Sequence, residues 1–132
     1  FLVCQIEDPE PLEELEAIAS VEGLDMLFFG PGDFSQGIGA PGEWEHPRLL
    51  EAQRRVAETA RAHGKFAGTV CSPESAARMV DLGYTFLSFG ADVVGMRQYA
   101  LDLTRRFNEM VPDRSGPVPV AAEMTNPYAR KG

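Results

Sequence analysis

Residues 24–33 read Leu24-Asp25-Met26-Leu27-Phe28-Phe29-Gly30-Pro31-Gly32-Asp33. The apolar run at 24–29 predicts a buried strand, which glycine and proline end at once. Asp33 follows a few residues after that strand end. Parallel α/β proteins keep their chemistry at the carboxyl ends of their strands. This stretch therefore predicts a strand of a parallel sheet with an acidic residue at its functional rim.

A second acidic strand end lies earlier in the chain. Residues 1–7 form another apolar run, which closes with Gln5-Ile6-Glu7. Because side chains alternate along a strand, Gln5 and Glu7 share one face and Ile6 points to the other. Carboxylates at the ends of neighbouring strands can share one divalent cation through oxygen ligands. Glu7 and Asp33 are therefore candidate metal ligands, against the alternative that both are solvated acids.

Strands and helices alternate along the chain. Strands are predicted over residues 1–7, 24–29, 66–71 and 84–89, helices over 11–21, 48–63, 73–82 and 92–110, and a long loop over 30–47. Such alternation specifies a parallel sheet. Four βα units are half of an eight-unit barrel, which needs about 250 residues. We expect an α/β fold of the (β/α)8 TIM-barrel type, with residues 1–111 supplying four C-terminal units and 112–132 forming a Pro- and Gly-rich tail.

Composition excludes several classes of partner. The 132 residues carry a net charge of −8, and no basic stripe offsets it, which argues against nucleic acid or anionic membrane. No apolar stretch approaches the roughly 20 residues that cross a bilayer, and the N-terminal run lacks the basic flank of a signal peptide. Cys4 and Cys71 fall in predicted strands, where we expect reduced structural thiols. A cytoplasmic protein is the expectation.

Two further features receive structural interpretations. Residues 37–42 match the pattern GxGxxG, but they neither follow a strand directly nor open a helix. We interpret them as a loop beside the site rather than a nucleotide cradle. His46 and His63 stand at opposite ends of one predicted helix, so they cannot bind one metal together from those positions.

The motifs together resemble the HpcH/HpaI family of metal-dependent, class II pyruvate aldolases over about residues 1–107. The resemblance rests on Cys4-Gln5-Ile6-Glu7, on residues 22–35, on Gly39 and Gly42 before His46-Pro47, on Gly64-Lys65 before Gly68, and on residues 86–92. The paired motifs at matching separation are more specific than a shared fold.

The resemblance implies a (β/α)8 barrel that binds a divalent cation and a pyruvate unit. It implies Mg²⁺ or Mn²⁺, with Co²⁺ and Zn²⁺ as further candidates, held by Glu7 and Asp33. By the same resemblance, Gln5 contacts the oxo acid, the amides of Gly32 and Asp33 hold its carboxylate, and Val70 shapes the pocket for the aldehyde. The family commonly has alanine where this chain has Gly32, which bears on substrate preference.

The expected function is a metal-dependent aldolase that cleaves or forms 2-oxo-4-hydroxy acids through a pyruvate enolate. Its partners would be a small oxo acid, an aldehyde and further copies of the chain. The family's catalytic base and arginine are expected in an N-terminal half outside this sequence, so the isolated chain is expected to be inactive. The last helix is expected to pack through its apolar positions, on a neighbouring subunit. The alternatives are a citrate or malyl-CoA type lyase of the same fold and a non-catalytic half-barrel module.

Overall fold

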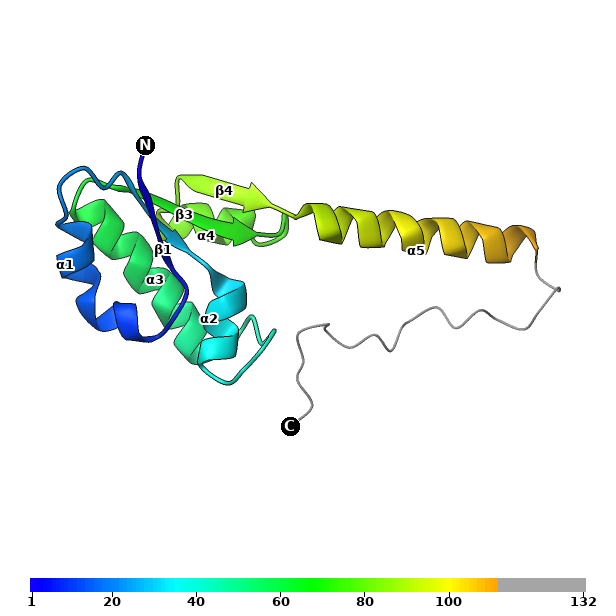
Figure 1. The fold of residues 1–132 in the computed structure, drawn as a ribbon, viewed down its shortest axis with the longest axis horizontal. Helices are drawn as coiled ribbons and strands as arrows, with labels where there is room; N and C mark the ends of the chain where they lie inside the picture. The colour runs from blue at the N-terminus through cyan, green and yellow to red at the C-terminus, as the bar shows by residue number, and fades with distance from the viewer. Residues whose placement is uncertain (112–132) are drawn as a thin grey trace. The chain divides into compact units, whose positions relative to one another are not determined.

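The computed structural model describes residues 1–111, which form a four-stranded parallel sheet with helices between the strands (Figure 1). The elements run β1 (Val3–Ile6), η1 (Glu10–Glu14), α1 (Leu15–Ala19), β2 (Met26–Phe29), α2 (Pro31–Gly37), α3 (Pro47–Ala62), β3 (Phe66–Cys71), α4 (Ala76–Leu82), β4 (Phe86–Phe89) and α5 (Asp92–Met110). The strand order β1-β2-β3-β4 follows the sequence. The predicted α/β alternation is confirmed, and the predicted tail lies outside the described residues.

One face of the sheet carries the hydrophobic core. Ile6, Leu27, Phe29 and Thr69 are at most 1% exposed, and α3 packs on the two central strands β2 and β3. The core cluster also includes Leu24, Ala67 and Tyr84, and the helices contribute Leu15, Ala19, Phe34, Leu49, Ala52, Val56, Ala57, Ala60 and Met79. Small alanines on α3 let that helix approach the sheet closely. This packing fixes the strand ends on which the candidate site stands.

The opposite face of the sheet is open in the described part of the chain. Its exposed apolar side chains include Val3, Phe66, Val70 and Phe86, of which Phe66 is 53% and Phe86 50% exposed. In a closed barrel this face lines the interior. The alternation predicted for the first strand is therefore confirmed, with the wholly apolar side turned to the helices.

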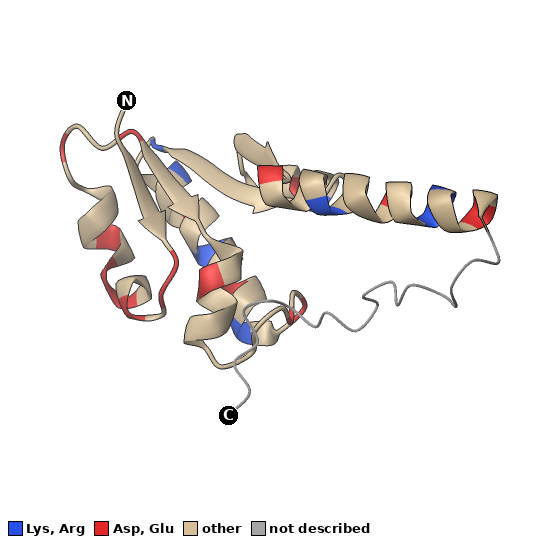
Figure 2. Cartoon of the chain, turned by 45° about the vertical axis from the view of Figure 1, so that its right-hand side comes forward, with Lys and Arg blue, Asp and Glu red and all other residues tan. Residues whose placement is uncertain are grey.

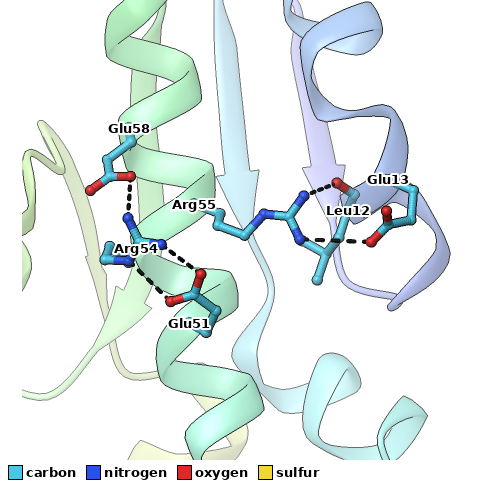
Figure 3. A network of polar contacts seen from close by, with 6 residues as sticks. All are labelled: Leu12, Glu13, Glu51, Arg54, Arg55 and Glu58. Carbon is cyan, nitrogen blue, oxygen red and sulfur yellow. Dashed lines mark hydrogen bonds and ion pairs between the residues drawn. The ribbon is translucent and has the colours of Figure 1, made fainter.

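Polar contacts on the outer surface tie α3 to the segment after β1. Figure 2 shows acidic positions along η1 and α1 and basic positions on α3. The Arg55 Nη2 donates to the carbonyl oxygen of Leu12 at 2.6 Å, and its Nη1 lies 3.7 Å from Glu13 (Figure 3). Within α3, Arg54 pairs with Glu51 and Glu58. Arg54 thus has the solvated role expected on a helix surface, whereas Arg55 joins two elements.

Two sequence predictions were wrong in their element type. Residues 31–37 form helix α2 rather than the start of a long loop, because Pro31 favours the first turn and Phe34 is buried against Phe29. The glycine content of this segment concealed its helical preference. The helix predicted over 11–21 is divided into the 3₁₀ turn η1 and the short α1.

The chain divides into two compact units, residues 1–89 and the residues from 90 onward. Helix α5, which begins the second unit, has no buried residue. The positions predicted to pack are exposed, namely Val93, Met96, Leu103 and Phe107. Whether they dock on another subunit stays a prediction. No helix among residues 1–111 is long and apolar enough to cross a membrane.

Candidate metal and substrate site

The site is built where β1 and β2 end side by side. The two strands pair in parallel up to Ile6 opposite Phe29, and the Gly30 amide donates to the Ile6 carbonyl oxygen at 2.9 Å. Glu7 and Gly30 therefore stand level with each other, one residue beyond the last pair. The next element, α2, begins at once with Pro31. The structure thus places both predicted acidic segments at one rim of the sheet.

Glu7 is held by its neighbour on the same strand face. The Gln5 Nε2 donates to the Glu7 Oε2 at 2.5 Å. Glu7 is half-buried and Gln5 is exposed on the open face. This hydrogen bond orients the carboxylate, and no residue among 1–111 forms a hydrogen bond to its other oxygen, which can accept from or coordinate a ligand. The prediction that the two side chains point the same way is confirmed.

Gly30 is a site residue that the sequence analysis missed. A Cβ at this position would lie 3.0 Å from the Gln5 Nε2, 3.0 Å from the Glu7 Cβ and 3.3 Å from the Glu7 Oε2. Glycine therefore leaves the space in which the Gln5–Glu7 pair sits. In the sequence, Gly30 is recognisable only as a glycine between a predicted strand and a proline. This local pattern does not predict that Gln5 and Glu7 lie next to it on the neighbouring strand.

Asp33 lies in the first turn of α2 and is exposed. The prediction that it belongs to a long loop over residues 30–47 is corrected, because the helix begins at Pro31. The buried Ser35 stabilises this turn by donating to the Gly32 carbonyl oxygen at 2.7 Å and accepting from the Gly42 amide at 3.1 Å. These two bonds tie the Asp33 turn to the loop that follows, and sequence reasoning had assigned Ser35 no role.

The floor of the open face below the rim is aromatic. Gly68 stands between Phe28 and Phe86 in the strand register, and the two rings meet over it at 6.2 Å in an edge-to-face arrangement. A Cβ on Gly68 would lie 2.6 Å from the Phe28 ring. Val70, one step further along β3, pairs with Ser88 and is 40% exposed. Val70 is therefore at the same end of the sheet as Glu7 and on the open face.

The donor set suits a hard divalent cation. The rim offers carboxylate oxygens, and Gly30 provides a cradle against Glu7 that any larger residue would fill. No group of three or more His, Cys, Asp or Glu side chains in residues 1–111 is arranged so that it could hold a metal ion. Two protein carboxylates would leave coordination positions for substrate and water. Cys71 is a free thiol whose pKa is raised by burial, and it stays neutral.

A parallel α/β sheet with acidic side chains at the carboxyl ends of adjacent strands defines the architecture of barrel enzymes that act at that rim. Residues 1–98 match the family described as HpcH/HpaI aldolase/citrate lyase, and the chain belongs to this family.

Characterised relatives and solved structures agree with this assignment. A hydroxypyruvate/pyruvate aldolase of Cupriavidus necator is 39% identical over 113 residues, which cover 85% of this chain and 42% of that protein. A 5-keto-4-deoxy-D-glucarate aldolase of Enterobacter sp. is 32% identical over 109 residues, covering 82% and 43%. The crystal structure of an HpcH/HpaI aldolase from Desulfitobacterium hafniense aligns with a TM-score of 0.72 at 27% identity, covering 90% of this chain and 45% of that one. The chain spans less than half the length of these relatives.

Proposed function

We propose that this chain supplies the metal- and pyruvate-binding part of a class II aldolase that cleaves or forms 2-oxo-4-hydroxy acids. The observation that carries the proposal is the Gln5–Glu7 hydrogen bond held in the space beside Gly30, level with the start of α2. The family match and the aldolase relatives support the same reaction class.

Each site residue has a distinct role in this proposal. Glu7 and Asp33 hold the divalent cation, Mg²⁺ or Mn²⁺ first among the candidates. When bound, the cation supplies Lewis-acid stabilisation of the negative charge that develops on the pyruvate unit. Gln5 orients Glu7 and donates to the oxo acid, while the backbone amides of Gly32 and Asp33 receive the substrate carboxylate. Val70 limits the space for the aldehyde.

The proton transfer needs a base that these residues do not provide. Glu7 and Asp33 are assigned to the cation, and His46 accepts a hydrogen bond from the Arg48 amide at 3.2 Å at the start of α3. His63 stands at the other end of that helix, 2.6 Å from Glu16. We propose that the base and an arginine come from the part of the barrel that lies outside the matched segment. Copies of the chain then assemble as a homo-oligomer.

Metal binding and proton exchange test the proposal separately. In the protein that carries the complete barrel, Glu7→Gln and Asp33→Asn should each weaken Mn²⁺ binding, measured by titration calorimetry. Both should also abolish Mn²⁺-dependent exchange of the pyruvate methyl protons in heavy water, followed by NMR. Asp81→Asn changes an exposed acid on α4 and serves as the control. Unchanged Mn²⁺ affinity in both site variants would contradict the metal assignment.

A further inference from the structure

Apart from the rim, a pocket lies between α3 and α4, beside the end of β3. It has a volume of about 370 Å³ and is lined by α3, α4, the loop before α3 and the segment after β3. This volume is at the lower end of the range for small-molecule sites. Pro31 and Val70 form the side nearest the rim, and Gln53, Arg78 and Ser75 form the rest of the polar wall. None of the proposed metal ligands lines it.

Gln53 makes this pocket more than a surface hollow. The side chain is 5% exposed, and its Oε1 has no hydrogen-bond partner among residues 1–111. The amide oxygen can accept hydrogen bonds from a ligand, and because almost none of its surface is open to solvent, the side chain must turn towards the pocket for a ligand to reach it. A buried polar atom without a partner destabilises the fold unless a ligand or water reaches it. The backbone here is already engaged, since the Gln53 carbonyl oxygen accepts from the Tyr84 hydroxyl at 2.9 Å.

Arg78 gives the pocket a positive charge. Its Nη1 lies 3.3 Å from the Glu45 Oε2, and the Glu45 side chain is 78% exposed. A single exposed ion pair is weak and uses only part of the guanidinium, whose fork of donors suits a carboxylate. An incoming anion can therefore share or replace Glu45 at Arg78 without disturbing buried structure.

The remaining wall combines apolar side chains, among them Leu49, Val70 and Met79, with two serine hydroxyls. Ser72 and Ser75 hydrogen-bond to each other around the turn before α4, the Ser72 amide donating to the Ser75 Oγ at 3.1 Å. The neighbouring Cys71 thiol is neutral, because burial raises its pKa. Arg78 and Glu45 are then the charged groups that line the pocket. The combination of a cation, hydroxyls and a buried amide suits a small, anionic and hydroxylated molecule.

We propose that this pocket binds a small hydroxycarboxylate, with the carboxylate on Arg78 and the hydroxyl donating to the Gln53 amide oxygen. The site goes beyond the proposed aldolase function, because it uses neither Glu7 nor Asp33. Only Val70 and Pro31 lie both in the pocket wall and next to the rim. A molecule bound in the pocket would therefore contact Val70, which is proposed to limit the space for the aldehyde.

Trp44 provides the readout, because it lines the pocket and is the only tryptophan of the 132 residues. Glycolate, the smallest hydroxycarboxylate, is titrated against Trp44 fluorescence, and acetate serves as the matched probe without a hydroxyl. Glycolate should change the fluorescence saturably and bind roughly tenfold more tightly than acetate, as one added hydrogen bond to a buried acceptor predicts.

Three variants sharpen the assignment. Gln53→Leu conserves volume and should reduce the affinity for glycolate to that for acetate. Arg78→Gln, a change at a partly exposed residue, should weaken both probes by tenfold or more. Arg61→Gln removes an arginine at the far end of α3, outside the pocket, and should bind both probes as the parent does. Circular dichroism verifies that each variant is folded.

The outcomes separate this site from the aldolase proposal. Glu7→Gln and Asp33→Asn should bind glycolate like the parent, whatever their effect on the metal. No saturable response, equal affinity for glycolate and acetate, or undiminished binding by Gln53→Leu and Arg78→Gln would overturn the pocket assignment. Loss of glycolate binding in the two rim variants would also overturn it, since the site would then depend on the rim.

Discussion

The two faces of the sheet divide the work of this chain. On the helix-covered face, Ile6, Leu27 and Phe29 are at most 1% exposed and carry the core. On the open face, Phe66 and Phe86 are about half exposed, while Gln5 and Glu7 make a specific polar contact. Alternate residues of the same short strands thus serve stability and chemistry. The core side chains on the helix-covered face hold the strands in place. They therefore position Gln5 and Glu7 on the opposite face, although they do not contact a ligand there.

The largest expected effect comes from emptying the covered face. Phe29→Ala removes a ring that is 0% exposed and packs on Phe34 at a centroid distance of 5.2 Å. The lost burial and the cavity should reduce the free energy of unfolding by about 3–5 kcal/mol, measured by urea denaturation. Phe66→Ala is the matched change on the open face and, measured in the 132-residue chain, should cost less than about 1 kcal/mol because Phe66 is 53% exposed there. Equal losses would show that the open face is covered in the folded protein.

A smaller effect is expected where the faces meet at the rim. In Gly30→Ala the new methyl makes tight contacts with the Gln5 Nε2 and the Glu7 Cβ, both at 3.0 Å, although the backbone φ of −98° suits any residue. Relieving this overlap should cost about 1–3 kcal/mol. The Gln5–Glu7 bond should be displaced, so Mn²⁺ affinity should fall in parallel. An unchanged free energy of unfolding together with an unchanged Mn²⁺ affinity would contradict the claim that Gly30 leaves the space for the Gln5–Glu7 pair.

The sequence predicted what depends on local pattern. The strands were recognisable because each apolar run is followed within two residues by glycine or proline. The 16-residue α3 was recognisable because its apolar residues recur at helical spacing. Helix α2 was missed because its glycines mask the effect of Pro31 and Phe34. Gly30 and Gln53 were missed for another reason. Their roles depend on neighbours across the sheet or between helices, and no local pattern specifies those neighbours.

The buried phenol of Tyr84 should make the stability of the protein depend on pH in the alkaline range. This residue is 2% exposed, donates to the Gln53 carbonyl oxygen, and has its pKa raised by burial. Unfolding restores the ordinary pKa of about 10, so stability is complete below that pH and falls as the pH rises above it, by about 1.4 kcal/mol per unit. The free energy of unfolding is measured by urea denaturation between about pH 9 and 11. In Tyr84→Phe it should fall less steeply with rising pH than in the parent. Parallel pH profiles of parent and variant would show that the phenol ionises in the folded state.

The smallest effect should come from Gly32→Ala, and its sign should be opposite. A Cβ at Gly32 meets nothing within 4 Å, and the residue lies in the first turn of α2. Alanine has fewer conformations to lose on folding, so the free energy of unfolding should rise by about 0.4–1 kcal/mol. The backbone amide proposed to hold the substrate carboxylate remains, so Mn²⁺ affinity should not change. Because Gly30 and Gly32 lie two residues apart, opposite signs for the two alanine variants would locate the crowded side of the rim at Gln5 and Glu7. A loss of stability in Gly32→Ala would instead mean that another part of the protein covers the first turn of α2.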